Sequence, residues 1–319
     1  MQTTILTHGD TDGICAGAIA LSRFPGADVF FTRPASFLSD LRETGPGRIV
    51  ITDIALNRKD APEASKLFRK LSGESEIHYF DHHNIAPEIK KQIRDSICHF
   101  SHAKNVSASE LIYRRFQKDI PKERVWIALY GAIGDYSDET PFARERILNW
   151  DRRALYFEVS TIAMGIKNDE FSTYDAKRMI VKALSRGKNP TDVPGLAASA
   201  KKAINREFEL YEQVKRKAKK SGSVGYVLDQ KSFGFRGPSA LFSATVTNSP
   251  MGLYVFTREK YIDITARTRD YTLKLNELME EASESVGGSG GGHAAAAGAR
   301  IPLGSLKRFL EKLNALLGD

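Results

Sequence analysis

Short apolar runs that favour β-strands alternate with amphipathic stretches that favour α-helices in the first part of the chain. The runs are TTILTH, DVFFT, RIVITDIAL and EIHYFDHH, and the stretches between them include DGICAGAIALSRF and PASFLSDLRE. Residues 49–51 are apolar without alternation, which is typical of a strand buried on both faces. The pattern predicts an α/β fold with a mainly parallel sheet flanked by helices, and chemistry at the carboxyl ends of its strands.

The later part of the chain changes in character twice. Residues 107–186 have a mainly helical pattern, and the loop residues of SRGKNPTDVPG predict a boundary after them. Residues 201–220 carry eight Lys or Arg and three Glu on a helix-favouring sequence, and the β pattern returns from Ser223. We therefore expect a first domain over 1–190, a helical connector over 191–222 and a smaller α/β domain over 223–319.

Composition is typical of a folded, soluble protein. The 319 residues are 41% hydrophobic and 27% charged, which argues against a disordered, collagen-like or disulfide-scaffold chain. The two cysteines, Cys15 and Cys98, are too few for a disulfide framework or a four-thiolate zinc site, and they favour a reducing, cytoplasmic setting. Neither a membrane span nor a signal peptide is indicated. The formal net charge of +8 favours polyanionic partners.

The segment HGDTDG carries the first cluster of ligand-type side chains. It directly follows the predicted strand TTILT and precedes an apolar helix, so His8, Asp10 and Asp12 can all point into a crevice at the strand end. Gly13 permits the tight turn into the helix. The alternative for Asp12 alone is an N-cap of that helix, but capping does not account for all three side chains.

Two further predicted strands also end in ligand-type residues. Asp53 interrupts the apolar run RIVITDIAL, and because an unpaired buried carboxylate is costly, it needs a cation, hydrogen bonds or an exposed strand end. Its alternative role is to cap a helix that begins after Asn57. Asp81, His82 and His83 follow the run EIHYF, so a third strand brings such groups to the same edge of the sheet.

Asp135 ends the helix-like stretch GAIGD, whose glycines permit close approach, and Asp138 is a less favoured substitute. The whole donor set holds carboxylates and imidazoles without thiolates, which suits Mn²⁺ or Mg²⁺ better than a thiolate zinc site. Two such cations bridged by a carboxylate would activate water and stabilise both oxygens in a displacement at phosphorus. The sequence therefore predicts hydrolysis of a phosphoester.

The motifs HGDTDG, VITD, DHH and GAIGD resemble, in this order, those of the DHH phosphoesterase superfamily. The segments SGGGHAAAAGA and ARTR resemble the glycine-histidine motif and the arginine segment of the DHHA1 domain. The opening motif is most similar to that of short archaeal RecJ-like exonucleases. The resemblance implies an N-terminal DHH domain, a connector and a DHHA1 domain, with the active site in the cleft between the two domains.

The resemblance also implies roles for the site residues. The metal ligands would be His8, Asp10 and Asp53 for a first ion, and Asp12, Asp53, His82 and Asp135 for a second. Asp53 would bridge the ions, Asp81 would orient His82, and His83 would contact the scissile phosphate as a donor or proton source. Two divalent cations are expected, with Mn²⁺ as the first choice and Mg²⁺ or Co²⁺ as alternatives.

A second group of residues, near the C-terminus, predicts a phosphate site. Backbone N–H groups of Gly290, Gly291 and Gly292 can face a phosphate, and His293 would begin an alanine-rich helix whose positive end favours an anion. The alternative is a flexible turn before a helix packed through small residues. Arg267, in ARTR, matches the substrate-binding arginine segment of the DHHA1 domain.

The leading hypothesis is a metal-dependent exonuclease that releases nucleoside monophosphates from single-stranded DNA or RNA, in the 3′-to-5′ direction by analogy with short archaeal relatives. A nano-RNase or a phosphatase acting on 3′-phosphoadenosine 5′-phosphate is the first alternative. A non-catalytic scaffold in replication or repair is an alternative of another class, which the intact ligand set disfavours. A helicase or a replication or repair protein would be a further partner. Tyr136 and Phe235 could stack on bases, but core packing is the commoner fate of aromatic side chains.

Overall fold

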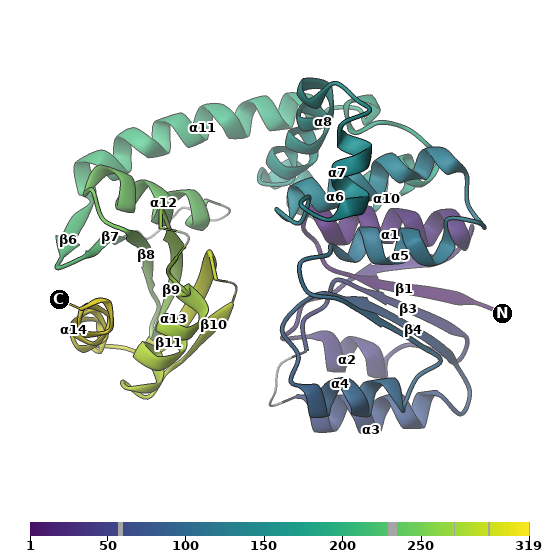
Figure 1. Cartoon of the computed structure of the whole chain (residues 1–319), viewed down its shortest axis with the longest axis horizontal. Helices are drawn as coiled ribbons and strands as arrows, with labels where there is room; N and C mark the ends of the chain where they lie inside the picture. The colour runs from purple at the N-terminus through teal and green to yellow at the C-terminus, as the bar shows by residue number, and fades with distance from the viewer. Residues whose placement is uncertain (57–59, 229–234, 271, 293, 319) are drawn as a thin grey trace. The chain divides into compact units, whose positions relative to one another are not determined.

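The computed structural model describes residues 1–56, 60–228, 235–270, 272–292 and 294–318. The chain forms two compact units, Met1–Ala203 and Ile204–Asp319, each with its own sheet and apolar core (Figure 1). Helix α11 (Leu196–Lys217) begins in the first unit and ends in the second. Within the described ranges, no helix is both long enough and apolar enough to cross a lipid bilayer.

The strands of the first unit form one parallel sheet, as the apolar runs predict. They are β1 (Thr3–Thr7), β2 (Asp28–Phe31), β3 (Arg48–Thr52), β4 (Glu76–Asp81) and β5 (His99–His102). Their order is β2-β1-β3-β4-β5, and every neighbouring pair is parallel. The apolar pattern did not indicate β5, because its sequence HFSH contains a single apolar residue.

Helices cover both faces of this sheet (Figure 1). On one face lie α1 (Thr11–Arg23) and α5 (Ala108–Phe116), with α6 (Val125–Gly134) and α10 (Tyr174–Ser185) packed against α1. On the other face lie α2 (Phe37–Arg42), α3 (Ala61–Leu71) and α4 (Pro87–Arg94). The remaining helical elements are η1 (Lys122–Arg124), α7 (Pro141–Ile147), α8 (Arg152–Gly165), α9 (Asp169–Ser172) and η2 (Pro190–Asp192).

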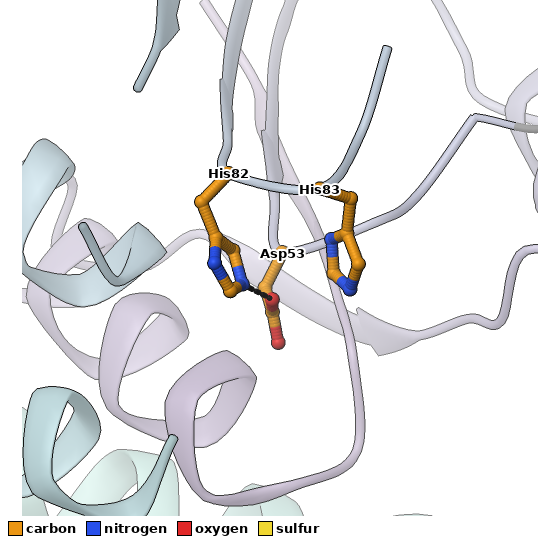
Figure 2. Close-up of side chains that lie close together, drawn as sticks. All are labelled: Asp53, His82 and His83. Atoms are coloured by element: carbon orange, nitrogen blue, oxygen red, sulfur yellow. Dashed lines mark hydrogen bonds and ion pairs between the residues drawn. The ribbon is translucent and has the colours of Figure 1, made fainter. Parts of the chain in front are cut away.

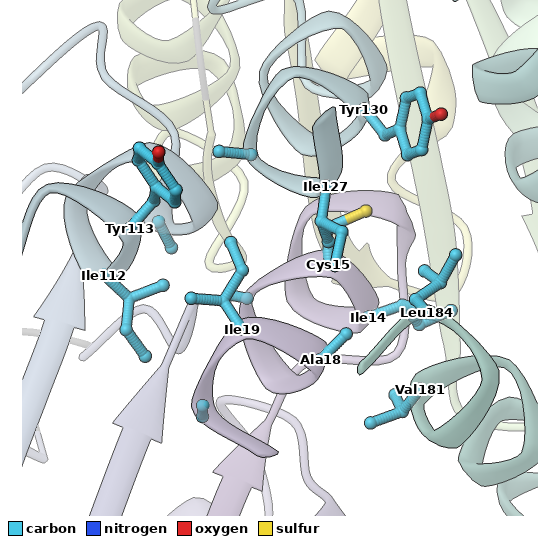
Figure 3. Close-up of a cluster of buried hydrophobic side chains, with 14 of the residues drawn as sticks. Ile14, Cys15, Ala18, Ile19, Ile112, Tyr113, Ile127, Tyr130, Val181 and Leu184 are labelled. Atoms are coloured by element: carbon cyan, nitrogen blue, oxygen red, sulfur yellow. The ribbon is translucent and has the colours of Figure 1, made fainter. Parts of the chain in front are cut away.

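Side chains of alternate strand residues supply both cores, which is why these runs are apolar without a break. Val50 packs in the α1 and α5 layer, whereas Ile49 and Ile51 pack in the layer of α2, α3 and α4. Figure 3 shows that α1 lies at the centre of the first layer, where Cys15 is buried between its neighbours. Cys98 is exposed, so the two thiols are not paired.

The second unit is also α/β, with helices on both faces of a six-stranded sheet. Its strands are β6 (Lys219–Ser221), β7 (Val224–Leu228), β8 (Met251–Thr257), β9 (Tyr261–Thr268), β10 (Ser289–Gly292) and β11 (Ala296–Pro302), in the order β10-β11-β9-β8-β7-β6. Its helices are α12 (Arg236–Val246), α13 (Leu275–Glu284) and α14 (Leu306–Leu317). The β7–β8 pair is parallel and the other pairs are antiparallel.

The expected alanine-rich helix after the glycine run is wrong. Residues Ala296–Pro302 form strand β11, which pairs along its whole length with β9. Alanine favours helices, but the run is only four residues long and lies between Gly292 and Gly298, and each glycine in a helix costs about 1 kcal/mol. Pairing with β9 and burial of Ala297 and Ile301 in the core outweigh local propensity here. Residues 294–302, the described segment directly after the glycine run, therefore offer no helix N-terminus for a phosphate.

Candidate metal centre

The order of the strands reverses between β1 and β3, whose carboxyl ends lie side by side. From β1 the chain proceeds to β2 on one side of the sheet, while β3, β4 and β5 lie on the other side. In parallel α/β sheets, ligands bind outside the carboxyl ends of the strands at such a reversal of strand order. His8 follows β1 directly and Asp53 follows β3 directly, so the candidate residues border this reversal.

The turn from β1 into α1 holds His8 and Asp10 together. Asp10 is the N-cap of α1, and its carboxylate accepts a hydrogen bond of 3.0 Å from the Gly13 N–H. A Cβ atom at position 13 would lie 2.3 Å from the His8 carbonyl oxygen, so only glycine fits this close turn. His8 Nδ1 lies 2.8 Å from Asp10 Oδ2 and 3.6 Å from Asp53 Oδ2.

Asp12 is buried and is held from two directions. Because Asp10 caps α1, the alternative role of Asp12 as that cap is wrong; Asp12 lies in the first turn of the helix. Its carboxylate accepts hydrogen bonds from the backbone N–H groups of Ala108 (2.7 Å) and Ser109 (3.0 Å), at the N-terminus of α5. This helix end stabilises the negative charge that burial disfavours. The SASE sequence at 107–110 signals such a helix start, but the sequence did not indicate its contact with Asp12.

Gly131 lets α6 approach Asp12. A Cβ atom at position 131 would lie 2.1 Å from Ser109 Oγ and 2.6 Å from Asp12 Oδ1. We expect Gly131→Ala to destabilise the protein by about 1–3 kcal/mol through overpacking, although alanine normally favours a helix. Displacing Asp12 should also weaken Mn²⁺ binding at least about tenfold, measured by calorimetry.

Gly45→Ala is the matched control, because a Cβ atom there meets no atom of the described structure within 4 Å. It should leave both the thermal midpoint and Mn²⁺ affinity unchanged. A Gly131→Ala variant as stable as the wild type would show that the close contact with α6 does not constrain the site.

Asp53 occupies a left-handed backbone conformation at the end of β3. Its φ is 59°, and its N–H still donates a ladder hydrogen bond of 2.9 Å to Phe80 O. Asp53 Oδ1 lies 3.2 Å from His82 Nε2, and Figure 2 shows the carboxylate between the rings of His82 and His83. No described group donates a hydrogen bond to the buried Asp53 Oδ2. Asp53 does not cap α3, whose N-cap is Asp60, so that alternative is also wrong.

His82 joins the acids of three elements. Besides its contact with Asp53, its Nε2 lies 3.9 Å from Asp12 Oδ2, and its Nδ1 lies 3.5 Å from Asp135 Oδ2. Asp135 is the C-cap of α6, and its carboxylate accepts a hydrogen bond of 2.9 Å from Ser137 Oγ. The C-terminus of α6 thus supplies Asp135, the fourth acid of the site.

His83 is held by a buried acid and by a second histidine. Its Nδ1 lies 2.8 Å from Asp81 Oδ1, so the ring that Asp81 orients is that of His83, which corrects the expected orientation of His82. The carboxylate of Asp81 is fully buried, whereas the side chain of His83 is 24% exposed. His102 Nε2 donates a hydrogen bond of 2.7 Å to the His83 carbonyl. The sequence pattern did not indicate His102, which lies on strand β5.

The surrounding acids stabilise the protonated histidines. The charge of Asp10 raises the pKa of His8 to about 11, with Asp53 adding to the effect. Burial lowers the pKa of His82, but its hydrogen bond to Asp53 and the charge of Asp12 outweigh burial and raise that pKa to about 10. The metal-free site therefore holds protons on both rings at neutral pH.

The pKa values of two buried carboxylates are also raised. Burial, followed by the charges of Asp10 and Asp12, raises the pKa of Asp53 to about 7. Burial and the charge of Asp12 raise the pKa of Asp135 to about 6. Carboxylates crowded in one crevice repel each other, and a cation bound among them removes this cost.

The described residues include three groups whose ligand atoms all lie within 4.8 Å of one another. These groups are His8, Asp10 and Asp53; Asp12, His82 and Asp135; and Asp53, His82 and His83. Asp53 belongs to two of them, and its Oδ2 has a lone pair without a described hydrogen-bond donor. The donors are oxygen and nitrogen atoms, which suit hard or intermediate divalent cations. The residues present therefore fit a divalent metal centre.

Lys177 is a neighbour of this centre that the sequence did not reveal. It comes from α10, and its Nζ donates a hydrogen bond of 2.6 Å to the carbonyl oxygen of Gly9. Burial lowers the pKa of its ammonium group, while the charge of Asp10 opposes this shift. In the sequence Lys177 is one of many lysines on a distant helix, so only the packing of α10 against α1 identifies it.

In the second unit, Arg267 and Gly291 lie on the same face of the sheet. Arg267 on β9 is opposite Ala296 on β11, and Gly298 of β11 is opposite Gly291 on β10. Opposed residues of antiparallel strands share a face, as do alternate residues of one strand, which places Arg267 and Gly291 together. A Cβ atom at Gly291 would meet no atom of the described structure within 4 Å, so this face is open there.

The other expected residues of this group are placed differently. Gly290 faces α13, where a Cβ atom would lie 2.4 Å from Met279 O, so packing requires glycine at this position. Gly292 alternates with Gly291 and therefore also points away from the face of Arg267. His293 lies outside the described residues.

Comparison with known proteins identifies a domain in the second unit. Residues 243–319 match the family model of the DHHA1 domain. A search of curated protein sequences finds no match.

Solved structures share the fold at low sequence identity. RecJ from Thermus thermophilus, determined in complex with Mn²⁺, has a TM-score of 0.69 at 16% identity, covering 99% of this chain and 52% of RecJ. An exonuclease RecJ bound to manganese has a TM-score of 0.64 at 16% identity, covering 99% of this chain and 90% of that one. The pGpG-specific phosphodiesterase PggH from Vibrio cholerae has a TM-score of 0.60 at 16% identity, covering 99% of both chains.

The chain spans about half the length of the Thermus thermophilus RecJ, which has also been determined in complex with Mg²⁺. This chain contains two parts of the RecJ-like fold, the parallel sheet of the first unit and the C-terminal DHHA1 domain. The chain therefore contains a DHHA1 domain over residues 243–319 and shares the RecJ-like fold.

Proposed function

We propose that the chain is a metal-dependent phosphodiesterase. One observation carries this proposal: acids and imidazoles at the ends of β1, β3, β4 and α6 come together at one edge of the sheet. Within each group, the ligand atoms lie within 4.8 Å of one another. The carboxylates repel one another, and divalent cations bound among them would offset this repulsion. RecJ, which shares the fold, was determined with Mn²⁺ and with Mg²⁺, which supports cations of this class.

Two cations fit the arrangement better than one, with Mn²⁺ as the first choice. The proposed ligands are His8, Asp10 and Asp53 for one ion, and Asp12, Asp53, His82 and Asp135 for the other. When bound, such ions supply Lewis acidity, which activates water and neutralises charge on a phosphate. Asp53 is the shared ligand because it belongs to both the His8 and the His82 groups.

His83 is the proposed donor to the substrate phosphate. Burial lowers the pKa of His83, but its hydrogen bond to Asp81 and the charge of Asp81 outweigh burial and raise the pKa, which favours the protonated ring. With Nδ1 bound to Asp81, Nε2 is the atom that would donate to a phosphate oxygen or protonate the leaving oxygen. His102 fixes the backbone of His83 and so keeps this ring in position.

Single-stranded nucleic acid is the proposed substrate. The exonuclease RecJ shares the fold, the chain carries a net charge of +8, and Arg267 lies on the same sheet face as Gly291, where that face is open. The proposed reaction removes nucleoside monophosphates from the 3′ end, a polarity that follows from the resemblance to short archaeal RecJ-like proteins. A helicase or a replication or repair protein as partner stays a prediction of the same resemblance.

Hydrolysis of very short substrates is the second candidate. Its support is PggH, named as a pGpG-specific phosphodiesterase, which aligns over 99% of both chains, whereas RecJ of Thermus thermophilus is about twice as long. A nano-RNase-like or nucleotide phosphatase activity would use the same metal centre without a long strand-binding surface.

One assay separates these candidates. Purified protein with Mn²⁺ or Mg²⁺ is incubated with end-labelled DNA and RNA strands of several lengths, with dinucleotides including pGpG, and with 3′-phosphoadenosine 5′-phosphate. We expect stepwise shortening of long strands from the 3′ end, visible as a ladder of 5′-labelled products. Release of the 5′ nucleotide first would reverse the polarity, and hydrolysis confined to dinucleotides would favour the second candidate. Absence of hydrolysis with every substrate would contradict the phosphodiesterase.

A further inference from the structure

The turn that carries Asp135 also displays an exposed aromatic ring. Tyr136 follows Asp135 directly at the end of α6, and its side chain is 93% exposed. The expectation that core packing accounts for this aromatic is therefore wrong. The chain reverses here, because the Tyr136 N–H donates to Ile133 O (3.2 Å) and the Ser137 N–H donates to Ala132 O (2.8 Å).

The backbone of Tyr136 is unfavourable for its residue type. Its φ is 56°, in the left-handed region that usually holds glycine or asparagine at a helix C-terminus. The other described non-glycine residues with positive φ are Asp53, Asn105 and Asn248, whose short polar side chains tolerate this region. A glycine at position 136 would make the same turn without strain. Since the ring buries little surface, the fold gains no stability that explains a tyrosine here.

The position of the Tyr136 ring beside the metal centre suggests a role for a tyrosine at this turn. Consecutive Cα atoms lie about 3.8 Å apart, so the Tyr136 side chain starts beside a proposed metal ligand. The carboxylate of Asp135 is held by Ser137 Oγ and approaches His82, so the turn that presents the ring is itself anchored to the site. Strained residues that the surrounding structure holds in place cluster at ligand-binding sites.

We propose that Tyr136 is a stacking platform for the nucleobase next to the scissile phosphate. This inference rests on the proposed function and specifies how that site takes its substrate. A base in single-stranded nucleic acid exposes a π-face, and stacking on an aromatic side chain accepts every base. The ring therefore favours strands with an unpaired base at the cleaved end and imposes little sequence preference.

The test compares Tyr136→Gly with the wild type on a single strand and on the same strand with an abasic nucleotide at the cleaved end. We expect kcat/KM on the intact strand to fall roughly 5- to 150-fold in the variant. On the abasic strand the two proteins should have similar kcat/KM values. The thermal midpoint of the variant should stay unchanged or rise, because glycine relieves the left-handed strain.

Three further variants sharpen the comparison. Tyr136→Phe and Tyr136→Trp should retain most of the activity, because each keeps a stacking face. Phe157→Ala on α8 removes another exposed ring, 61% exposed, and should leave kcat/KM unchanged on both strands.

Equal kcat/KM for Tyr136→Gly and wild type on the intact strand would overturn the stacking role while leaving the nuclease proposal intact. An equal loss on intact and abasic strands would also overturn it, because the ring would then act without the base. If the wild type hydrolyses no strand, both this inference and the proposed function fail.

Discussion

The Asp53→Asn variant is expected to lose hydrolysis by about 10³-fold or more, together with the stabilisation that Mn²⁺ gives the wild type. Residues that only hold a metal ligand in place typically contribute roughly 10- to 100-fold to affinity or activity, and a ligand shared by two ions should contribute more. Asparagine keeps the shape of the side chain and tolerates the left-handed φ of 59°. The substitution therefore removes a charge without straining the turn.

Stability measurements separate loss of the site from loss of the fold. Ionised Asp53 is disfavoured in the metal-free protein, since burial and the neighbouring acids raise its pKa to about 7. The metal-free variant should therefore unfold at or above the wild-type temperature near pH 8. Added Mn²⁺ should raise the thermal midpoint of the wild type by mass action and leave that of the variant unchanged.

Asp138→Asn is the matched control, because Asp138 lies three residues beyond Asp135 and outside the three ligand groups found among the described residues. It should respond to Mn²⁺ as the wild type does. A full response of Asp53→Asn to Mn²⁺ would refute Asp53 as a shared ligand, and with it the proposed two-ion centre.

Metal affinity is expected to rise steeply with pH, by about tenfold per pH unit for each proton that binding displaces. His8 and His82 have pKa values of about 11 and about 10 in the metal-free protein, so both rings are protonated at neutral pH. A metal ligand must be a neutral imidazole, so occupation of both sites releases two protons. Between pH values of about 7 and about 10 the combined affinity should thus rise about 100-fold per unit.

The carboxylates also make metal affinity rise with pH. Below a pH of about 7, Asp53 also takes up a proton, so Mn²⁺ must displace it and the slope becomes steeper. Calorimetric titrations in buffers with different ionisation enthalpies measure the protons released. His82→Asn should release one proton fewer, while His99→Asn, outside the ligand groups, should match the wild type. Affinity that does not depend on pH would contradict these two histidines as ligands.

Much of the site could be predicted from the sequence because three of its segments end parallel strands. The carboxyl ends of parallel strands meet at one edge, so His8, Asp53 and His82 could be placed together without coordinates. The local roles were harder to assign. Which aspartate caps α1, and which histidine Asp81 orients, depends on the backbone geometry of each turn, where Asp10 accepts from the Gly13 N–H and Asp81 contacts His83.

Long-range packing decided the features that the sequence did not predict. The run AAAA favours a helix locally, yet Ala296–Pro302 became a strand because β9 offered unpaired backbone groups and a core to cover. Lys177 and the N-terminus of α5 reach the metal centre only because α10 and α5 pack beside α1.

The sequence by itself determined the alternation of strands and helices, the parallel first sheet and the kinds of atoms gathered at its edge, because these depend on local pattern and on strand direction. The tertiary structure alone decided the left-handed turn at Asp53, the burial of Asp12 against a distant helix end and the outward ring of Tyr136. The first two features arise from contacts between segments far apart in the chain, and the third depends on where the rest of the fold packs; no local pattern contains these energies.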